Sequence, residues 1–158
     1  MNITILSVGK IKDKWFAAAQ GEYEKRISRF AKLRIVELAD EAAPKNASAK
    51  DIENLMKKEG ERIIAAIPKE TTLIVLTPEG KEMDSPDFAR LIGSYQDMGR
   101  SLTFVIGGSY GIDKAIKAMA AHRVSFSMMT FPHRLFRIML VEQIYRAFKI
   151  LGGEEYHK

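Results

Sequence analysis

Short apolar runs of β-branched and aromatic residues recur along the chain, and they constrain its fold more than any other feature. Residues 102–106 read LTFVI, and residues 71–76 read TTLIVL. Continuous apolar runs of this length are typical of strands buried on both faces, as in a parallel sheet covered by helices. Between the runs, apolar residues recur at three- and four-residue spacing, which indicates helices. The sequence therefore predicts an α/β fold with a mostly parallel sheet flanked by helices.

The predicted strands and helices alternate from one end of the chain to the other. Strands are expected at residues 3–8, 33–38, 71–76, 102–106 and 124–127. Helices are expected at residues 15–30, from the Ser48–Asp51 capping pair to Pro68, and at residues 112–121 and 132–150. Another helix is expected to begin with Ser85 as its cap and Pro86 in its first turn, and to run through Tyr95. Residues 77–80 read TPEG and are expected to turn the chain after the third strand. No repeat or linker interrupts the pattern, so residues 1–158 are predicted to form one domain.

The composition favours a cytoplasmic protein with an anionic partner. The formal charge is +5 and the isoelectric point is near 9.4, and nucleic acid is the commonest partner of such a basic protein. The chain has no cysteine, which excludes disulfides and thiolate metal sites and agrees with a reducing compartment. No uncharged apolar run reaches the ~18 residues that a membrane span needs. The first residues lack the basic region and apolar core of a signal peptide.

The last third of the chain concentrates the residues that suit chemistry. Residues 105–111 end a strand on a glycine turn, where backbone amides can approach a ligand closely. Residues 125–133 lead from a strand through a loop rich in Met and Phe to a proline. The final helix and tail carry proton-handling and phosphate-reading groups: Glu142, Tyr145, Arg146, Tyr156 and His157. Structural explanations stay open, since glycine turns, core methionines and frayed tails are common without any ligand. The three histidines are too scattered for a zinc site, and no metal is predicted.

These segments resemble the RlmH family of SPOUT-class methyltransferases. The resemblance extends over nearly the whole chain in the family's order, and it is strongest at residues 105–111, 125–133, 142–147 and 156–158. It implies a SPOUT-type α/β fold whose C-terminal part forms a trefoil knot. It also implies methylation of N3 of a pseudouridine in 23S ribosomal RNA of the large subunit, with S-adenosyl-L-methionine as the methyl donor. Genuine knots are rare, and no periodicity could have indicated one.

By the same resemblance, two groups of residues form the site. The cofactor is expected to contact Leu76, Gly108, Ser127, Met128, Met129, Thr130, Phe131 and Pro132. The residues available for catalysis are His133, Glu142, Tyr145, Arg146, Tyr156 and His157. Tyr156 and His157 are expected nearest the target base, with Arg146 on a phosphate or another anion. Which group accepts the N3 proton stays open, although histidine has the most suitable unperturbed pKa, about 6.5.

The resemblance also implies a homodimer that packs through the C-terminal region. The final helix carries an apolar stripe wider than one contact with the sheet needs: Leu135, Ile138, Met139, Val141, Ile144, Phe148 and Leu151. The tail beyond Gly153 could then serve the cofactor site of the other subunit. Two alternative functions stay in view. One is a knotted methyltransferase that acts on a transfer RNA base, and the other is a non-catalytic RNA-binding factor in ribosome assembly.

Overall fold

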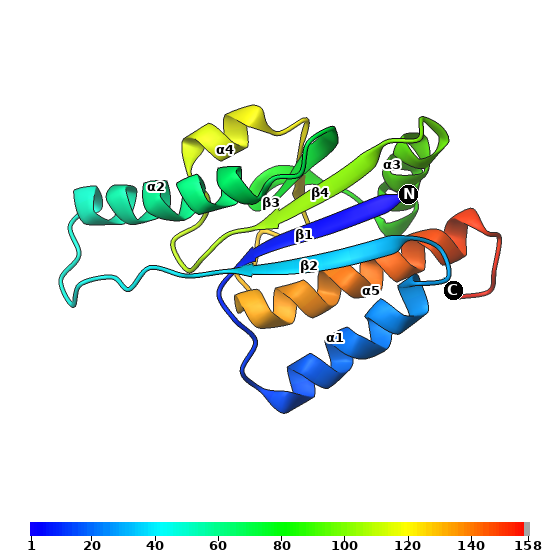
Figure 1. The fold of residues 1–158 in the computed structure, drawn as a ribbon, viewed down its shortest axis with the longest axis horizontal. Helices are drawn as coiled ribbons and strands as arrows, with labels where there is room; N and C mark the ends of the chain where they lie inside the picture. The colour runs from blue at the N-terminus through cyan, green and yellow to red at the C-terminus, as the bar shows by residue number, and fades with distance from the viewer. Residues whose placement is uncertain (157–158) are drawn as a thin grey trace.

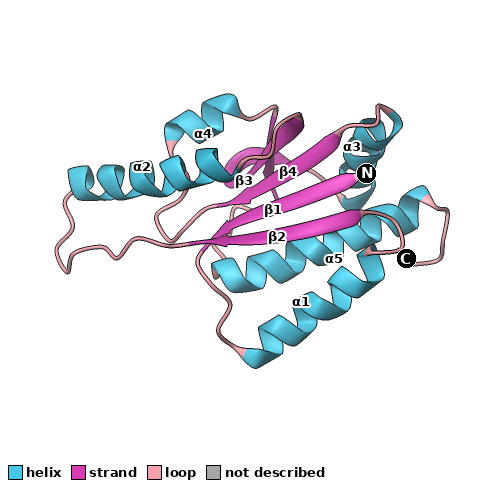
Figure 2. Cartoon of the chain, viewed as in Figure 1, coloured by secondary structure: helices cyan, strands magenta, loops and turns pink. Residues whose placement is uncertain are grey.

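A five-stranded parallel sheet forms the centre of the molecule, as the apolar runs predicted. The computed structural model describes residues 1–156 (Figures 1 and 2). The strands are β1 (Asn2–Val8), β2 (Lys32–Leu38), β3 (Thr71–Glu82), β4 (Ser101–Ile106) and β5 (His122–Ser125). Their order is β2-β1-β4-β3-β5, and every neighbouring pair is parallel. All strands therefore end at one edge of the sheet, which we call the carboxyl edge.

Helices cover both faces of this sheet. They are α1 (Lys14–Ile27), α2 (Ala49–Ala66), α3 (Ser85–Asp97), α4 (Lys114–Met119) and α5 (His133–Leu151). Helix α5 packs against both α1 and α3 on one face, while α2 and α4 pack together on the other (Figure 1). Because side chains alternate across a strand, Phe104 belongs to the core under α5 and its neighbour Val105 to the core under α2 and α4. No helix within residues 1–156 combines the length and apolar composition that a membrane crossing requires.

The helix starts are set by side-chain caps. Ser48 and Asp51 form the predicted capping box at the start of α2. The prediction that Ser85 caps α3 is wrong, because the Asp84 carboxylate accepts the N–H of Asp87 at 2.7 Å and fills that position. Ser85 is instead the first helical residue, and its hydroxyl donates to the Gln143 side chain at 2.7 Å. This bond ties the start of α3 to α5.

The ends of β3 and β5 differ from the prediction. Strand β3 does not end at Leu76, because Leu76 and Lys81 both pair with Val124 of β5 and residues 77–80 bulge out between them. Strand β5 spans residues 122–125 instead of 124–127, which leaves Phe126 and Ser127 in the loop before α5. Helix α4 is shorter than predicted, because Asp113 caps it by accepting the Ala115 N–H at 2.8 Å.

Candidate functional site

Three loops meet at the carboxyl edge around a cavity of about 640 Å³, which we call the edge pocket. One is the bulge of β3 at residues 77–80, the other two follow β4 and β5, and the first turn of α5 closes the pocket. Ligands of open parallel sheets commonly bind at this edge. Seven of the eight residues expected to contact a cofactor line the pocket: Leu76, Gly108, Ser127, Met129, Thr130, Phe131 and Pro132. The eighth, Met128, is not part of the lining and is 73% exposed.

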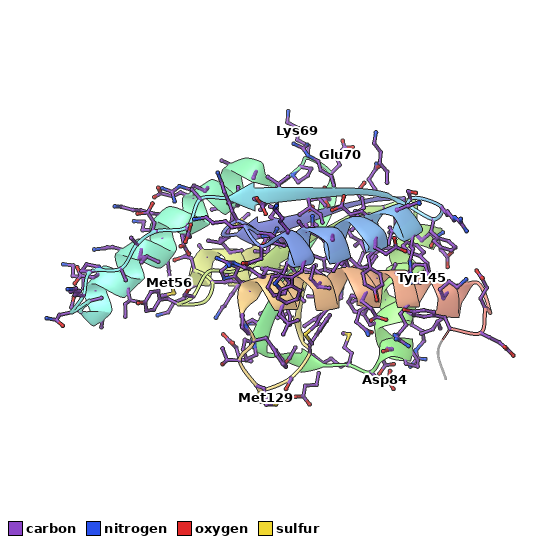
Figure 3. All side chains as sticks on the ribbon, turned by 90° about the horizontal axis from the view of Figure 1, so that it is seen from below. Met56, Lys69, Glu70, Asp84, Met129 and Tyr145 are labelled. Atoms are coloured by element: carbon purple, nitrogen blue, oxygen red, sulfur yellow. The ribbon has the colours of Figure 1, made fainter. Side chains whose placement is uncertain are left out.

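The loop between β5 and α5 is held by short hydrogen bonds of its own. The Ser125 hydroxyl donates to the carbonyl of Ser127 at 3.1 Å, and the Ser127 hydroxyl accepts the N–H of Met129 at 3.0 Å. At its far end, Phe131 stacks on Phe136 of α5, with ring centroids 6.3 Å apart. Met129 projects from the outermost part of this loop (Figure 3) and is 70% exposed. The loop therefore has a defined shape and leaves an apolar side chain at its tip.

Glu59 of α2 lies directly behind the glycine turn. The side chain is 3% exposed, and its Oε1 accepts the N–H of Glu41 at 2.9 Å. Its Oε2 is buried and has no partner within residues 1–156. Burial raises the pKa of Glu59, and the nearby charges of Asp40 and Glu41 raise it further. The hydrogen bond from the Glu41 N–H lowers the pKa, but the net shift is upward.

This carboxyl explains why residue 108 is a glycine. A Cβ added at Gly108 would lie 2.7 Å from Oε2 of Glu59. The glycine turn was expected to let backbone amides approach a ligand closely, but the first atoms that a side chain at residue 108 would meet are those of Glu59. Sequence reasoning missed Glu59, although it had a signal, because Leu55, Glu59 and Ile63 share one buried stripe of α2.

His133 lies apart from the other expected catalytic residues. It lines the edge pocket at the start of α5, and a Cβ added at Gly9 would lie 2.8 Å from its Nε2. That nitrogen is buried and has no partner within the described chain. Burial lowers the pKa of His133, and the charges of Arg134 and Arg137 lower it further. His133 and Glu142 are nine positions apart, which corresponds to about 13.5 Å along the helix.

The structure brings Glu142, Arg146 and Tyr156 together at the other end of α5. Arg146 Nη2 donates to Glu142 Oε1 at 2.7 Å, and the Tyr156 hydroxyl donates to the same oxygen at 3.2 Å. The Arg146 guanidinium lies 4.8 Å from the Tyr156 ring centroid, and Tyr145 meets that ring edge-on at 5.0 Å. We call these four residues the tail cluster. The remaining expected residue, His157, lies outside the described residues.

The pKa of Tyr156 decides which form of the phenol is present. Burial raises this pKa to about 12, helped by hydrogen bonding to Tyr23 and by the Glu142 charge. The phenol therefore keeps its proton at neutral pH and acts as a hydrogen-bond donor. Arg146 stays positively charged beside Glu142, because the hydrogen bond between the two side chains raises the arginine pKa.

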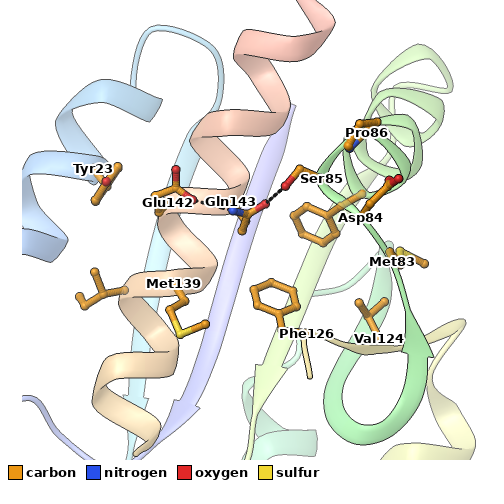
Figure 4. A pocket seen from close by; sticks show the side chains of 12 residues that line it. Tyr23, Met83, Asp84, Ser85, Pro86, Val124, Phe126, Met139, Glu142 and Gln143 are labelled. Carbon is orange, nitrogen blue, oxygen red and sulfur yellow. Dashed lines mark hydrogen bonds between the residues drawn. The ribbon is translucent and has the colours of Figure 1, made fainter. Parts of the chain in front are cut away.

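A second cavity of about 680 Å³ lies between α1, α3 and α5, and we call it the helix groove (Figure 4). Tyr23, Glu142 and Gln143 line it, and Gln143 Nε2 donates to Glu142 Oε2 at 2.7 Å. Phe126 lines both cavities, so the helix groove adjoins the edge pocket. Sequence reasoning missed Tyr23 and Gln143, which are ordinary residues of amphipathic helices until the fold places them beside Glu142.

A fully buried arginine fixes α5 to the sheet beneath the site. Arg137 Nη1 donates to Glu37 Oε1 at 2.6 Å, and Nη2 donates to the Ser7 hydroxyl at 3.0 Å and to the carbonyl of Gly9 at 2.8 Å. Burial alone would raise the pKa of Glu37, but hydrogen bonds from the Ile11 N–H and from Arg137 outweigh it and lower the pKa. Within residues 1–156, no group of three or more His, Asp or Glu side chains is arranged to hold a metal ion.

Known proteins resemble the chain along its full length. The family model described as "Predicted SPOUT methyltransferase" matches residues 1–157. A protein of Clostridium botulinum named "Ribosomal RNA large subunit methyltransferase H" is 50% identical, with 100% of both chains covered. A relative from Methanococcus maripaludis is 48% identical, again with 100% of both chains covered. A solved structure of a probable methylase family protein from Haemophilus influenzae covers 99% of this chain and 70% of that one, with a TM-score of 0.54. At 10% identity, that likeness concerns the fold alone.

Proposed function

This chain belongs to the SPOUT methyltransferase family, and we propose on that premise that it methylates ribosomal RNA of the large subunit. The observation that carries this proposal is the 50% identity, over the whole of both chains, to a protein named for that activity. The finer reaction that we propose is methylation of N3 of a pseudouridine, with S-adenosyl-L-methionine as donor. The basic charge of the chain suits an RNA substrate.

The edge pocket fits the proposed cofactor. Its volume of about 640 Å³ suits a small-molecule site, and its walls are mainly apolar, with backbone groups of the glycine turn at one side. Leu76, Gly108 and residues 127–132 would hold the cofactor, with Met128 nearby as an exposed neighbour. When bound, S-adenosyl-L-methionine supplies an electrophilic methyl group. The trefoil knot is proposed for the C-terminal part because the family implies it, and the whole chain is proposed to work as one domain.

The chain's own residues divide the remaining work. The imide N3–H of the base must lose its proton, and a positive charge or a hydrogen-bond donor stabilises the anion that forms. Arg146 and Tyr156 can do this, because one is a cation and the other keeps its phenolic proton. Glu142 is a poor base, since three hydrogen-bonding side chains already engage its oxygens. We assign the proton acceptor to His133, which lines the edge pocket and whose lowered pKa favours the neutral imidazole.

We propose that the working unit is a homodimer with a shared site. Phe136 at the edge pocket and Arg146 in the tail cluster are ten residues apart, which is about 15 Å along α5. An antiparallel pairing of two α5 helices would bring the tail cluster of one subunit to the edge pocket of the other. Leu135 and Leu151 at the two ends of α5 are 38% and 44% exposed, which leaves apolar area for such a contact.

Replacing Gly108 with valine is expected to weaken binding of S-adenosyl-L-methionine by at least about tenfold, or about 1.4 kcal/mol. The added side chain would collide with Glu59 and push the glycine turn out of place. Calorimetric titration measures the effect. The control is Gly21→Ala, because Gly21 lies in α1 with open space around it. This variant should bind the cofactor normally. If the collision with Glu59 causes the loss, the double variant Gly108→Val, Glu59→Ala should recover part of the affinity. Normal binding by Gly108→Val alone would refute this explanation.

The choice of RNA separates the proposed function from its alternatives. We expect that methyl-labelled donor, incubated with the protein and either large ribosomal subunits or transfer RNA, labels only the subunits. Binding of S-adenosyl-L-methionine is expected to be unchanged by a chelator, because no metal takes part in the proposed mechanism. Label in transfer RNA would favour the other kind of knotted methyltransferase. Binding to subunits with no label in either RNA would favour a non-catalytic assembly factor.

A further inference from the structure

An exposed tryptophan follows three lysines in the segment that leads from β1 into α1. Trp15, the single tryptophan of the chain, is 64% exposed at the start of α1. Its ring stacks on Phe16, with ring centroids 3.4 Å apart and an interplanar angle of 27°. Lys10, Lys12 and Lys14 are exposed, and none of the three forms an ion pair within residues 1–156. We call residues 10–15 the Trp15 loop.

The structure ties this loop to the candidate site. Asp13 pairs with Arg134 of α5 at 2.6 Å, one residue after His133 of the edge pocket. The N–H of Ile11 donates to Glu37 at 2.9 Å, and Glu37 also pairs with the buried Arg137. Asp13 and Glu37 are thus both paired, and Lys10, Lys12 and Lys14 give the loop a positive charge. The loop follows β1 and therefore lies at the same carboxyl edge as the edge pocket.

We propose that the Trp15 loop is a second RNA contact, in which Trp15 stacks on an unpaired base near the target nucleotide and the lysines hold adjacent phosphates. Aromatic rings bind unpaired bases by stacking, and lysines bind phosphates without regard to sequence. Phe16 backs one part of the indole while most of the ring stays open to solvent. The proposal rests on the proposed function, because it takes ribosomal RNA as the partner.

The fluorescence of Trp15 tests the contact without any methyl transfer. Because the chain has one tryptophan, its emission reports on this site alone. Short single-stranded RNA of mixed sequence should quench the emission and shield it from acrylamide, and abasic RNA of equal length and charge should not. A triple variant with alanine at positions 10, 12 and 14 should show an RNA affinity that depends less steeply on salt concentration. The matched control replaces Lys32, Lys69 and Arg100, which are exposed at the opposite edge of the sheet, and should change that dependence less.

Kinetics with large ribosomal subunits give a second measure. Trp15→Ala should raise KM roughly 5- to 100-fold with kcat nearly unchanged, and Trp15→Tyr should recover most of the loss. The control is Met98→Ala, because Met98 is equally exposed, at 63%, and lies beyond α3. If the Trp15 emission does not change when RNA is bound, the proposal is overturned. A Trp15→Ala chain that binds RNA normally but no longer dimerises would also overturn it, because the surface would then be a subunit contact. If RNA quenches the Trp15 emission but the protein does not methylate large subunits, the proposed function is refuted and the RNA contact stands.

Discussion

A chain that ends at Gly153 is expected to lose methyl transfer by about 10²- to 10⁴-fold, the usual contribution of positioned proton-handling groups. The truncation removes Tyr156, which donates to Glu142 and lies against Arg146. It also removes His157, which we expect near the target base on the grounds of its chemistry. Binding of S-adenosyl-L-methionine should be nearly unchanged, because residues 154–156, the described part of the tail, do not line the edge pocket of their own chain. Initial rates with large ribosomal subunits and calorimetry of the cofactor separate the two effects.

Mixing this truncated chain with Gly108→Val tests whether the tail acts across subunits. In a mixed dimer, the truncated subunit has an intact edge pocket and the other subunit has an intact tail. With the donor kept too dilute to occupy Gly108→Val, both parents should have little activity, and if tails act in trans their mixture should be active. Native mass spectrometry verifies that mixed dimers are present. An inactive mixture with proven mixed dimers would show that each tail serves its own subunit, with the base entering through the adjoining helix groove.

Replacing Arg137 with alanine is expected to lower the free energy of unfolding by about 3–5 kcal/mol, as breaking a buried ion pair does. The change leaves the carbonyl of Gly9 and the hydroxyl of Ser7 without their donor. Arg137→Met should cost less, because the methionine fills the volume that alanine leaves empty. Denaturant unfolding measures both variants. The control is Arg26→Ala, which breaks the exposed pair with Glu22 and should leave unfolding nearly unchanged.

The pH dependence gives the Arg137 prediction a second check. The pKa of Glu37 is lower in the folded chain than in the unfolded chain. The pair therefore stabilises the fold fully above the unfolded pKa of Glu37, and this stability is lost as pH falls through the lower, folded pKa. The stability difference between the natural chain and Arg137→Met should shrink over that acidic range. A difference that stays constant with pH would show that Glu37 contributes nothing through the pair.

Local pattern was enough to predict the sheet, because apolar runs define the strands and the loops after parallel strands must meet at one edge. Gly108 and residues 127–132 came instead from the family resemblance, and all of them except Met128 line the edge pocket. The reason for Gly108 could not be predicted, because Glu59 lies about fifty positions earlier in the chain. Arg137 was missed for the same cause, since its partners in β1 and β2 are 100 or more residues away. The expected catalytic residues follow one another in sequence, but the length of α5 separates His133 from the tail cluster.

Mass spectrometry of the nucleosides of large-subunit RNA tests the central claim most directly. Large subunits that lack the modification are incubated with the natural chain and S-adenosyl-L-methionine, and their RNA is digested to nucleosides. We expect N3-methylpseudouridine to appear, and the chain that ends at Gly153 should yield almost none. A digest with no new methylated nucleoside, from a protein that demonstrably binds S-adenosyl-L-methionine and large subunits, would contradict the claim.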